Sequence, residues 1–452
     1  MGETAQDKHA DDRLQALTNA LERGTLQNVW KMLNNLHPAE IAQLLESLPP
    51  AERDLVWKLV SPDNGGEVLL HVNDELRTRL ISDMGPDELL AATEGMDMDD
   101  LADLIDDLPD TVIREVVRSM DKQNRRRLES VLSYPEDSAG GLMNTDTITV
   151  RADVTLDVVL RYLRLRGEIP DLTDALIVVN RFDKFLGMLS LSRLLTNDPN
   201  LTVAEVMDRQ VEPIDANLSA SEVARIFERL DLISAPVIDS ERRLLGRITI
   251  DDVVDVIRDE AEHSLMSMAG LDEEEDMFAP VVTSTRRRAV WLGVNLVTAF
   301  LAAWVIGQFQ GVIEKVVALA VLMPIAASMG GIAGTQTLTL MIRGLALGHV
   351  GRANARWLMT KELLVGALNG TLWALVVGLI ATAWFGDAMI GVFVGAALMI
   401  NLVIAALAGF GIPLLLRRVG VDPALAGSVI LTTVTDVVGY MAFLGMATMF
   451  FL

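Results

Sequence analysis

Residues 421–452 read VDPALAGSVILTTVTDVVGYMAFLGMATMFFL. Apart from Asp422 at its start, this segment is apolar or weakly polar, yet Asp436 lies deep inside it. At about 1.5 Å of rise per residue, the segment is long enough to cross a bilayer as a helix. A charge at that depth costs at least about 2.5 kcal/mol on insertion scales, so it normally faces a bundle interior or a watery path. We therefore expect a membrane helix in which Asp436 has a function.

One face of this segment is polar at helical spacing. Its members are Ser428, Thr432, Asp436 and Tyr440. A polar stripe on a helix that otherwise suits lipid predicts one wall of a pore. The alternative is a neutral Asp436 that is buried and hydrogen-bonded to a neighbouring helix.

The composition divides the chain into a membrane part and an acidic soluble part. Its 452 residues exceed one compact domain, and 51% of them are hydrophobic. Residues 286–452 carry 10 Lys or Arg and 5 Asp or Glu. Residues 1–285 therefore carry 28 basic and 57 acidic side chains, a net charge of −29. Such a field repels nucleic acid and attracts cations.

Several classes of protein are disfavoured by what the sequence lacks. Without cysteine the chain can form no disulfide, thiolate metal site or thiol nucleophile, and five scattered histidines do not suggest a zinc or copper centre. It shows no nucleophile and base arrangement and no phosphate-binding loop, so we do not expect an enzyme. Residues 1–12 are polar and do not form a signal peptide, so we expect residues 1–285 to stay on the side where they are made.

Residues 12–132 repeat a helix-start pattern, in which a turn residue or Pro and an acid precede apolar residues three and four apart. We expect residues 1–132 to form an all-α superhelix of short paired helices. Asp99 and Asp103 lie one turn apart on one predicted helix face. These carboxylates either face solvent or bind a cation.

Two similar units, 64 residues apart, start at Met143 and Met207, and each combines short apolar strands with amphipathic helices. The pair resembles tandem CBS domains, a regulatory α+β module that often binds adenine nucleotides between its halves. We assign residues 133–206 to the first domain and residues 207–252 to the second.

The CBS resemblance also implies a nucleotide site. In that family a Ser or Thr and an Asp three residues later hold the ribose, and Thr249 and Asp252 match this pattern. The first unit has Ser190 and then Arg193 instead. The resemblance therefore implies one site for ATP or another adenine nucleotide.

A connecting region is predicted at residues 253–285. It begins with a helix at 253–268, continues with an acidic run at 272–276 and ends at three arginines, 286–288, before the first apolar segment. A helix in this position can transmit force to the membrane part, although a passive linker fits the same sequence.

Five segments of residues 286–452 are apolar and long enough to cross a bilayer. They lie at 289–309, 316–342, 358–385, 390–416 and 424–452. Positive residues gather before the first segment and between the second and third and the fourth and fifth, which predicts a cytoplasmic N-terminus and an external C-terminus. An odd number of spans without an internal repeat favours a pore between subunits.

The second of these segments contains residues 324–336, PIAASMGGIAGTQ, where a Pro and three Gly interrupt the apolar pattern. Small residues let helices approach closely, and loosened backbone carbonyls can face a water-filled path. Tight packing explains the same composition, but the polar Gln336 favours a path.

The domain order resembles that of the MgtE family of magnesium channels over essentially the whole chain. Three motifs carry the resemblance: YPEDSAGGLM at 134–143, the segment 324–336, and Asp422-Pro423-Ala424 with Thr432, Thr433 and Asp436. The resemblance implies a multidomain membrane protein with an all-α superhelical N-domain, α+β tandem CBS domains and an all-α five-helix transmembrane domain at 286–452. It also implies a multi-pass protein of the cytoplasmic (inner) membrane.

For function, the resemblance implies a homodimer in which two Asp436 carboxylates face a largely hydrated Mg²⁺, since this ion dehydrates reluctantly. The implied pore lining is Ser428, Thr432, Gln336 and Ile332. Cytosolic Mg²⁺, bound at acidic interfaces, would hold the pore shut. The matching carboxylates are Asp99, Asp103, Asp231, Asp251, Asp252, Asp255, Glu260 and Asp422.

The sequence departs from the family pattern in two places. Ile332 stands where the family usually has Asn, which concerns the selectivity for Mg²⁺, and His263-Ser264 stands where a Glu-Asp pair is common, which concerns the gate. Two alternatives therefore stay open: transport of another divalent cation such as Co²⁺, or of several, and a non-conducting membrane sensor of Mg²⁺ or nucleotide. A buried charge at pore depth disfavours the sensor.

Overall fold

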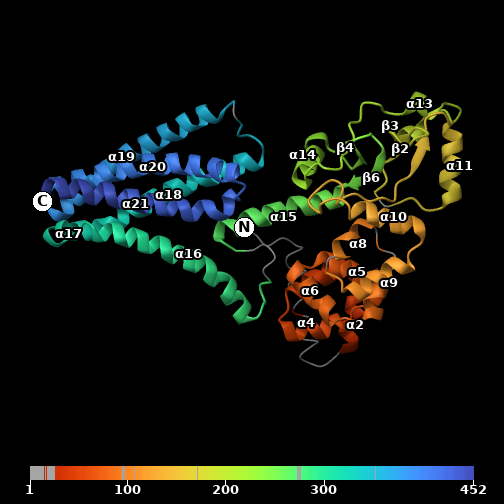
Figure 1. Cartoon of the computed structure of the whole chain (residues 1–452), viewed down its shortest axis with the longest axis horizontal. Coiled ribbons are helices and arrows are strands. Elements are labelled where there is room, and N and C mark those ends of the chain that lie inside the picture. The colour runs from red at the N-terminus through yellow and green to blue at the C-terminus, as the bar shows by residue number, and fades with distance from the viewer. Residues whose placement is uncertain are drawn as a thin grey trace. The chain divides into compact units, whose positions relative to one another are not determined.

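The computed structural model describes residues 15, 17, 26–93, 96, 98–105, 107–170, 172–271, 276–351 and 353–451. The chain divides into two compact units (Figure 1). The first unit consists of Met1–Ala261 and Glu274–Ala279, and the second of Glu262–Glu273 and Pro280–Leu452. Of the predicted acidic run at 272–276, only Asp276 lies within the described residues.

The N-terminal part of the first unit consists of short helices. They are α2 (Leu26–Leu33), α3 (Pro38–Glu46), α4 (Pro50–Trp57), α5 (Pro62–His71), α6 (Asp74–Asp83), α7 (Pro86–Thr93), α8 (Met98–Ile105), α9 (Asp110–Ser119) and α10 (Lys122–Val131). Four of them begin with Pro, where the missing amide is not needed, and His37 and Glu40 form a capping box around the start of α3. Helices α3, α5, α7 and α9 pack in succession, as in a helical repeat.

Two three-stranded sheets follow, ordered β1-β2-β3 and β4-β5-β6, each with a parallel and then an antiparallel pair. The elements are β1 (Thr149–Arg151), α11 (Leu156–Arg166), β2 (Ala175–Val179), β3 (Phe185–Ser190), α12 (Leu191–Thr196), α13 (Val203–Val206), β4 (Ile214–Asp215), α14 (Ala220–Leu230), β5 (Ser234–Ile238) and β6 (Leu244–Thr249). The order of strand, helix, strand, strand occurs twice in this part of the chain. The connecting helix, α15 (Ile250–Ala269), begins directly after β6.

The second unit contains five helices that are long and apolar enough to cross a membrane. They are α16 (Val281–Gly307), α18 (Ala318–Ala346), α19 (Ala355–Phe385), α20 (Ala388–Val419) and α21 (Pro423–Phe451), with the short α17 (Gln310–Lys315) between the first two. Helix α20 is the most buried of the five and packs against α18, α19 and α21. The predicted fold class is confirmed.

Two local features differ from the sequence pattern. Helix α16 begins eight residues before the predicted span and includes the three arginines, because a helix continues beyond the apolar part that hydropathy detects. Helix α18 runs without a break through residues 324–336. Pro324 is the seventh residue of α18 and lies inside the helix. Gly330 packs against Asn401 and Gly334 against Leu431, whereas a β-carbon at Gly331 would meet nothing within 4 Å.

Candidate functional site

The polar stripe of α21 lies beside the packed face of that helix. Leu431, Thr435 and Gly439 are buried, whereas Asp436 is half-buried and Thr432 is exposed on the single chain. Within the described residues, the Asp436 carboxylate has no hydrogen bond or ion pair. The alternative in which Asp436 binds a neighbouring helix of the same chain is therefore not observed.

The other predicted pore residues of α18 also lie outside the packed core of the single chain. Gln336 is exposed and Ile332 is 56% exposed, while Gly330 and Gly334 face inward. A β-carbon at Gly334 would come within 2.9 Å of the Leu431 side chain, which shows how closely α18 and α21 approach. Tight packing and an outward polar group thus occur together on α18.

Asn401 of α20 is a polar residue that the sequence analysis missed. It is fully buried, and its amide nitrogen donates a hydrogen bond of 2.8 Å to the carbonyl of Ala326. Gly330 and Gly439 pack against its side chain and leave no room for a β-carbon. A lone Asn within the fourth apolar segment is the signal that could have identified this joint between α18, α20 and α21.

Glu362 of α19 is a second missed residue. It is only 8% exposed, accepts a hydrogen bond of 3.2 Å from the Thr337 hydroxyl of α18 and pairs with Lys361 at 3.0 Å. The sequence shows a carboxylate near the start of the third predicted span. It does not show the hydrogen bond of this carboxylate to α18, because that contact depends on how the two helices pack.

Asp422, a predicted metal ligand, has partners on both oxygens of its carboxylate. It caps α21 by accepting hydrogen bonds from the amides of Ala424 and Leu425, at 2.9 and 3.2 Å. Its other contact is the ring nitrogen Nε2 of His263, at 3.3 Å, on the last turns of α15. His263, which departs from the family pattern, therefore contacts Asp422, which the resemblance identifies as a ligand of a cation.

In the first unit, acidic residues of α8 meet the second CBS-like unit. Ala102 packs against the hydrophobic core that contains Val253 of α15. Near it, Asp99 is buried and Asp103 is exposed. The surrounding protein, and then the charges of Glu136 and Asp100, raise the pKa of Asp103 to about 7.

Asp252 lies at the start of α15, on the other side of this contact. Removal from water and then the charge of Asp251 raise the pKa of Asp252 to about 7, and Asp100 of α8 contributes to the rise. The Thr249 hydroxyl donates a hydrogen bond of 3.1 Å to Asp252, so the two residues of the predicted ribose site are adjacent. Asp100 of the N-terminal helices is thus close enough to Asp252, at the start of α15, for its charge to raise the pKa of Asp252.

The remaining predicted ligands are more dispersed. Asp231 ends α14 in the left-handed conformation and is exposed, Asp255 pairs with Arg258 at 3.1 Å, and Glu260 is exposed. Asp251 is exposed at the start of α15. In the part of the chain that the structure describes, no three His, Asp or Glu side chains come together closely enough to hold a metal ion.

Comparisons with known proteins cover nearly the whole chain. Family models match at residues 323–446 (MgtE, divalent cation transporter), 36–137 (MgtE intracellular N domain), and 139–199 and 203–259 (CBS domain). The magnesium transporter MgtE of Thermus thermophilus is 32% identical over 96% of this chain and 97% of its own length. That of Bacillus subtilis is 26% identical over 98% and 99%.

A solved structure is similar to the soluble part. The cytosolic domain of the Mg²⁺ channel MgtE in complex with ATP is 31% identical, and the match covers 54% of this chain and 99% of that domain, with a TM-score of 0.49. The family models and the Thermus thermophilus relative span the soluble and the membrane parts of the chain in one order.

Proposed function

Because the chain belongs to the MgtE family of divalent cation transporters, we propose that it conducts Mg²⁺ across the cytoplasmic membrane as a homodimer with the pore between its two copies. The observation that carries this proposal is the stripe of α21, where Asp436 and Thr432 are accessible on the single chain. Contact of such a carboxylate with lipid would be costly. A second copy over the stripe removes that cost and brings two Asp436 carboxylates together.

The chemistry of the stripe suits a hydrated divalent cation. Mg²⁺ gives up its water reluctantly, so it passes more easily between outer-sphere oxygen contacts than through a closed cage of ligands. Asp436 has no partner in the described protein and can accept hydrogen bonds from the ion's water. Ser428, Thr432 and Gln336 supply further polar groups on the same proposed wall.

The acidic contact of the first unit supports closure by cytosolic Mg²⁺. Near neutral pH, Asp103 and Asp252 retain protons for part of the time because their pKa values lie at about 7. A divalent cation can replace those protons and hold α8 against the start of α15. When the ion leaves, repulsion between the carboxylates favours separation, and α15 passes the change to the membrane unit. The proposed regulatory ligands otherwise remain those named from the family resemblance.

His263 modifies this gate in the present chain. Its ring nitrogen already contacts Asp422, so one carboxylate of the proposed regulatory set has a protein partner without any cation. We expect the N-terminus on the cytoplasmic side and the C-terminus outside, as the positive residues of the loops indicate. The adenine nucleotide proposed for Thr249 and Asp252 would bind in the first unit, on the same side as the regulatory Mg²⁺.

Ion flux into liposomes that contain the purified protein tests conduction. We expect Mg²⁺ uptake by the native chain and a loss of at least tenfold in Asp436→Asn, because that variant loses the pore charge but keeps the shape of the side chain. Tyr440→Phe, one turn away on the stripe, is the matched control and should conduct. Unchanged flux in Asp436→Asn would exclude Asp436 from the pore. No flux for any divalent cation would favour the sensor.

A second function, transport of Co²⁺ or of several divalent cations, is favoured by one observation. The apolar Ile332 side chain is exposed on α18, where an amide would offer hydrogen bonds to a hydrated ion. Competition of Co²⁺ and Ca²⁺ with Mg²⁺ in the same liposomes tests this function. If Ile332→Asn shifts the preference towards Mg²⁺, Ile332 broadens selectivity, and an identical preference in both proteins would exclude that role.

A further inference from the structure

A pocket in the first unit has no part in the proposed transport or gating. Its volume is about 540 Å³, and α10 forms one side of it. The lining residues that matter for its chemistry are Lys122, Arg126, Arg127, Thr145, Leu244 and Leu245. Three cationic side chains therefore meet two leucines of β6 in a unit that is otherwise strongly acidic.

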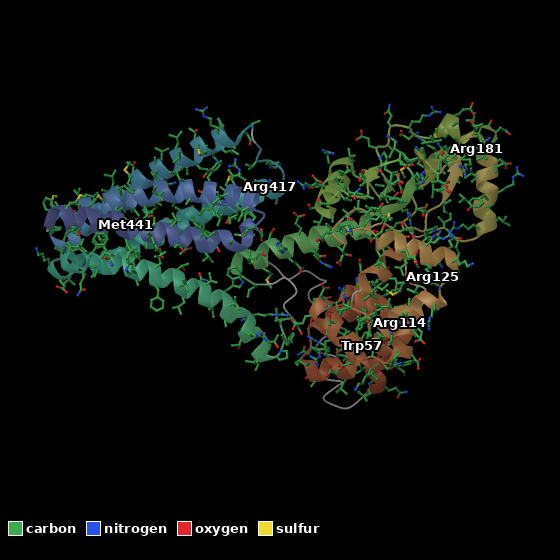
Figure 2. All side chains as sticks on the ribbon, viewed as in Figure 1. Trp57, Arg114, Arg125, Arg181, Arg417 and Met441 are labelled. Atoms are coloured by element: carbon green, nitrogen blue, oxygen red, sulfur yellow. The ribbon has the colours of Figure 1, made fainter. Side chains whose placement is uncertain are left out.

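The sequence of α10, KQNRRRLESV, explains why the cations gather. Lys122 and Arg126 lie one turn apart and share a face of the helix. Arg125, labelled in Figure 2, points elsewhere, because its guanidinium donates hydrogen bonds to the carbonyl of Val117. Arg127 reaches Asp146 at 3.5 Å, whereas Lys122 and Arg126 have no ion pair among the described residues. Two cations thus remain uncompensated at the pocket despite the excess of acids.

Thr145 provides an independent indication of a ligand. Its side chain lines the pocket and is only 7% exposed, yet its hydroxyl has no hydrogen-bond partner among the described residues. A buried polar group without a partner typically costs about 1–3 kcal/mol. The hydroxyl oxygen itself is out of contact with solvent, and rotation of the Thr145 side chain would bring it to the pocket. There it could donate a hydrogen bond to an anionic oxygen, which would remove that cost.

We propose that this pocket binds a small soluble anion that carries at least two phosphate groups. Lys122, Arg126 and Arg127 would hold the phosphate oxygens by charge-assisted hydrogen bonds, and Thr145 would donate one more. Leu244 and Leu245 offer an apolar surface to the uncharged part of such a molecule. The volume lies within the usual range of small-molecule sites, roughly 300–1,000 Å³.

This site is separate from the predicted nucleotide site. Leu244 begins β6 and Thr249 ends it, so the two sites lie about 16 Å apart along the strand, at about 3.3 Å per residue. The anion would touch both α10 and β6. Its binding would therefore stabilise the packing of the N-terminal helices against the second CBS-like unit.

Isothermal titration of the full-length protein in detergent with inorganic pyrophosphate, in a chelating buffer without Mg²⁺, tests the proposal. We expect saturable binding that weakens at least tenfold in the double variant Lys122→Gln/Arg126→Gln. Arg118→Gln, which removes an exposed cation from the neighbouring α9, is the matched control and should bind as the native protein does. Absence of binding, or equal binding by the double variant, would overturn the proposal.

Two further variants keep the result interpretable. Thr145→Val preserves the shape of the side chain and removes the hydroxyl, so it should weaken pyrophosphate binding several-fold without a loss of thermal stability. Thr249→Ala should leave pyrophosphate binding unchanged. If Thr249→Ala abolishes binding while the double variant retains it, the anion occupies the nucleotide site and the proposal is wrong. Mg²⁺ flux is measured separately and depends on Asp436, so the two proposals can fail independently.

Discussion

At the level of single residues, the first unit places carboxylates beside other carboxylates, and these neighbours help to raise the pKa values of Asp103 and Asp252. Asp103 and Asp252 belong to different domains, and both are influenced by the charge of Asp100. Proton uptake is one way to relieve this repulsion, and cation binding is the other. The pH should therefore change the stability of this contact in a direction that the pKa values determine.

The first unit should lose stability as the pH rises in the absence of divalent cations. In an unfolded chain both carboxylates titrate near pH 4, and in the folded chain near pH 7. Their pKa values are raised by folding, so their favourable contribution is complete below about pH 4 and is lost as the pH passes about 7. With a chelator present, protease resistance of the first unit should fall as the pH rises from about 4 to about 7 and change little above that.

Two additions complete this pH experiment. Mg²⁺ should restore the resistance at pH 8, and Asp252→Asn should flatten the pH profile because it removes one of the titrating groups. Glu228→Gln changes an exposed acid on α14 and serves as the control. A profile that stays the same in Asp252→Asn would show that this carboxylate does not titrate in the proposed range.

Arg53 is expected to be the most sensitive basic residue of the first unit. It is fully buried, donates a hydrogen bond of 2.8 Å to the carbonyl of Leu45 and pairs with Asp276 at 2.6 Å. Arg53→Met leaves Asp276 buried without its partner, which should lower the free energy of unfolding by about 3–5 kcal/mol. Urea titration followed by pulse proteolysis measures this change.

Arg79 provides the matched control for Arg53. Its pair with Asp54, at 3.0 Å, is about one third exposed on each side, so Arg79→Met should cost no more than about 1 kcal/mol. If Arg53→Met and Arg79→Met lower the free energy of unfolding equally, burial does not determine how much each ion pair contributes to stability. Asp276 also lies five residues before α16, so Arg53 fixes the end of the connecting region to the N-terminal helices.

At the level of elements, close approach of α18, α20 and α21 organises the membrane unit. A β-carbon at Gly409 of α20 would come within 2.7 Å of the Gly334 carbonyl, whereas one at Gly411 would meet nothing within 4 Å. Gly409→Ala should therefore separate α18 from α20 and lower the thermal stability of the detergent-solubilised protein by several degrees, while Gly411→Ala should not. Equal melting temperatures would show that the helices can adjust.

The elements also show how far sequence patterns reach. Hydropathy located all five long helices, because apolar length is a property of each segment alone. It could not pair Asn401 with Ala326 or Glu362 with Thr337, since those contacts depend on how separate helices pack. Asp436 could be identified as a candidate from its charge alone. The proposed cytosolic ligands came from the family resemblance, and among the described residues no three His, Asp or Glu side chains come together closely enough to hold a metal ion.

At the level of the whole molecule, the proposed homodimer would supply a partner surface for the polar stripe. Asp436, Thr432 and Gln336 are all accessible on the described bundle, although they lie on membrane helices. A homodimer with α21 near its axis would cover them with water and with a second set of polar groups. The alternative, a monomer, would expose them to lipid.

Cross-linking distinguishes these arrangements cleanly, because the chain contains no cysteine and any thiol that is introduced reports only its own position. Thr432→Cys lies on the stripe, one turn from Asp436, and a short bis-maleimide should join two copies in native membranes to give twice the monomer mass. Leu368→Cys is the matched control, since it is 72% exposed on α19, away from the proposed axis. Efficient cross-linking at Leu368 but not at Thr432 would place the subunit contact on α19 and leave Asp436 outside a shared pore. Cross-linking at Thr432 that Mg²⁺ alters would further link the cytosolic acids to the width of that pore.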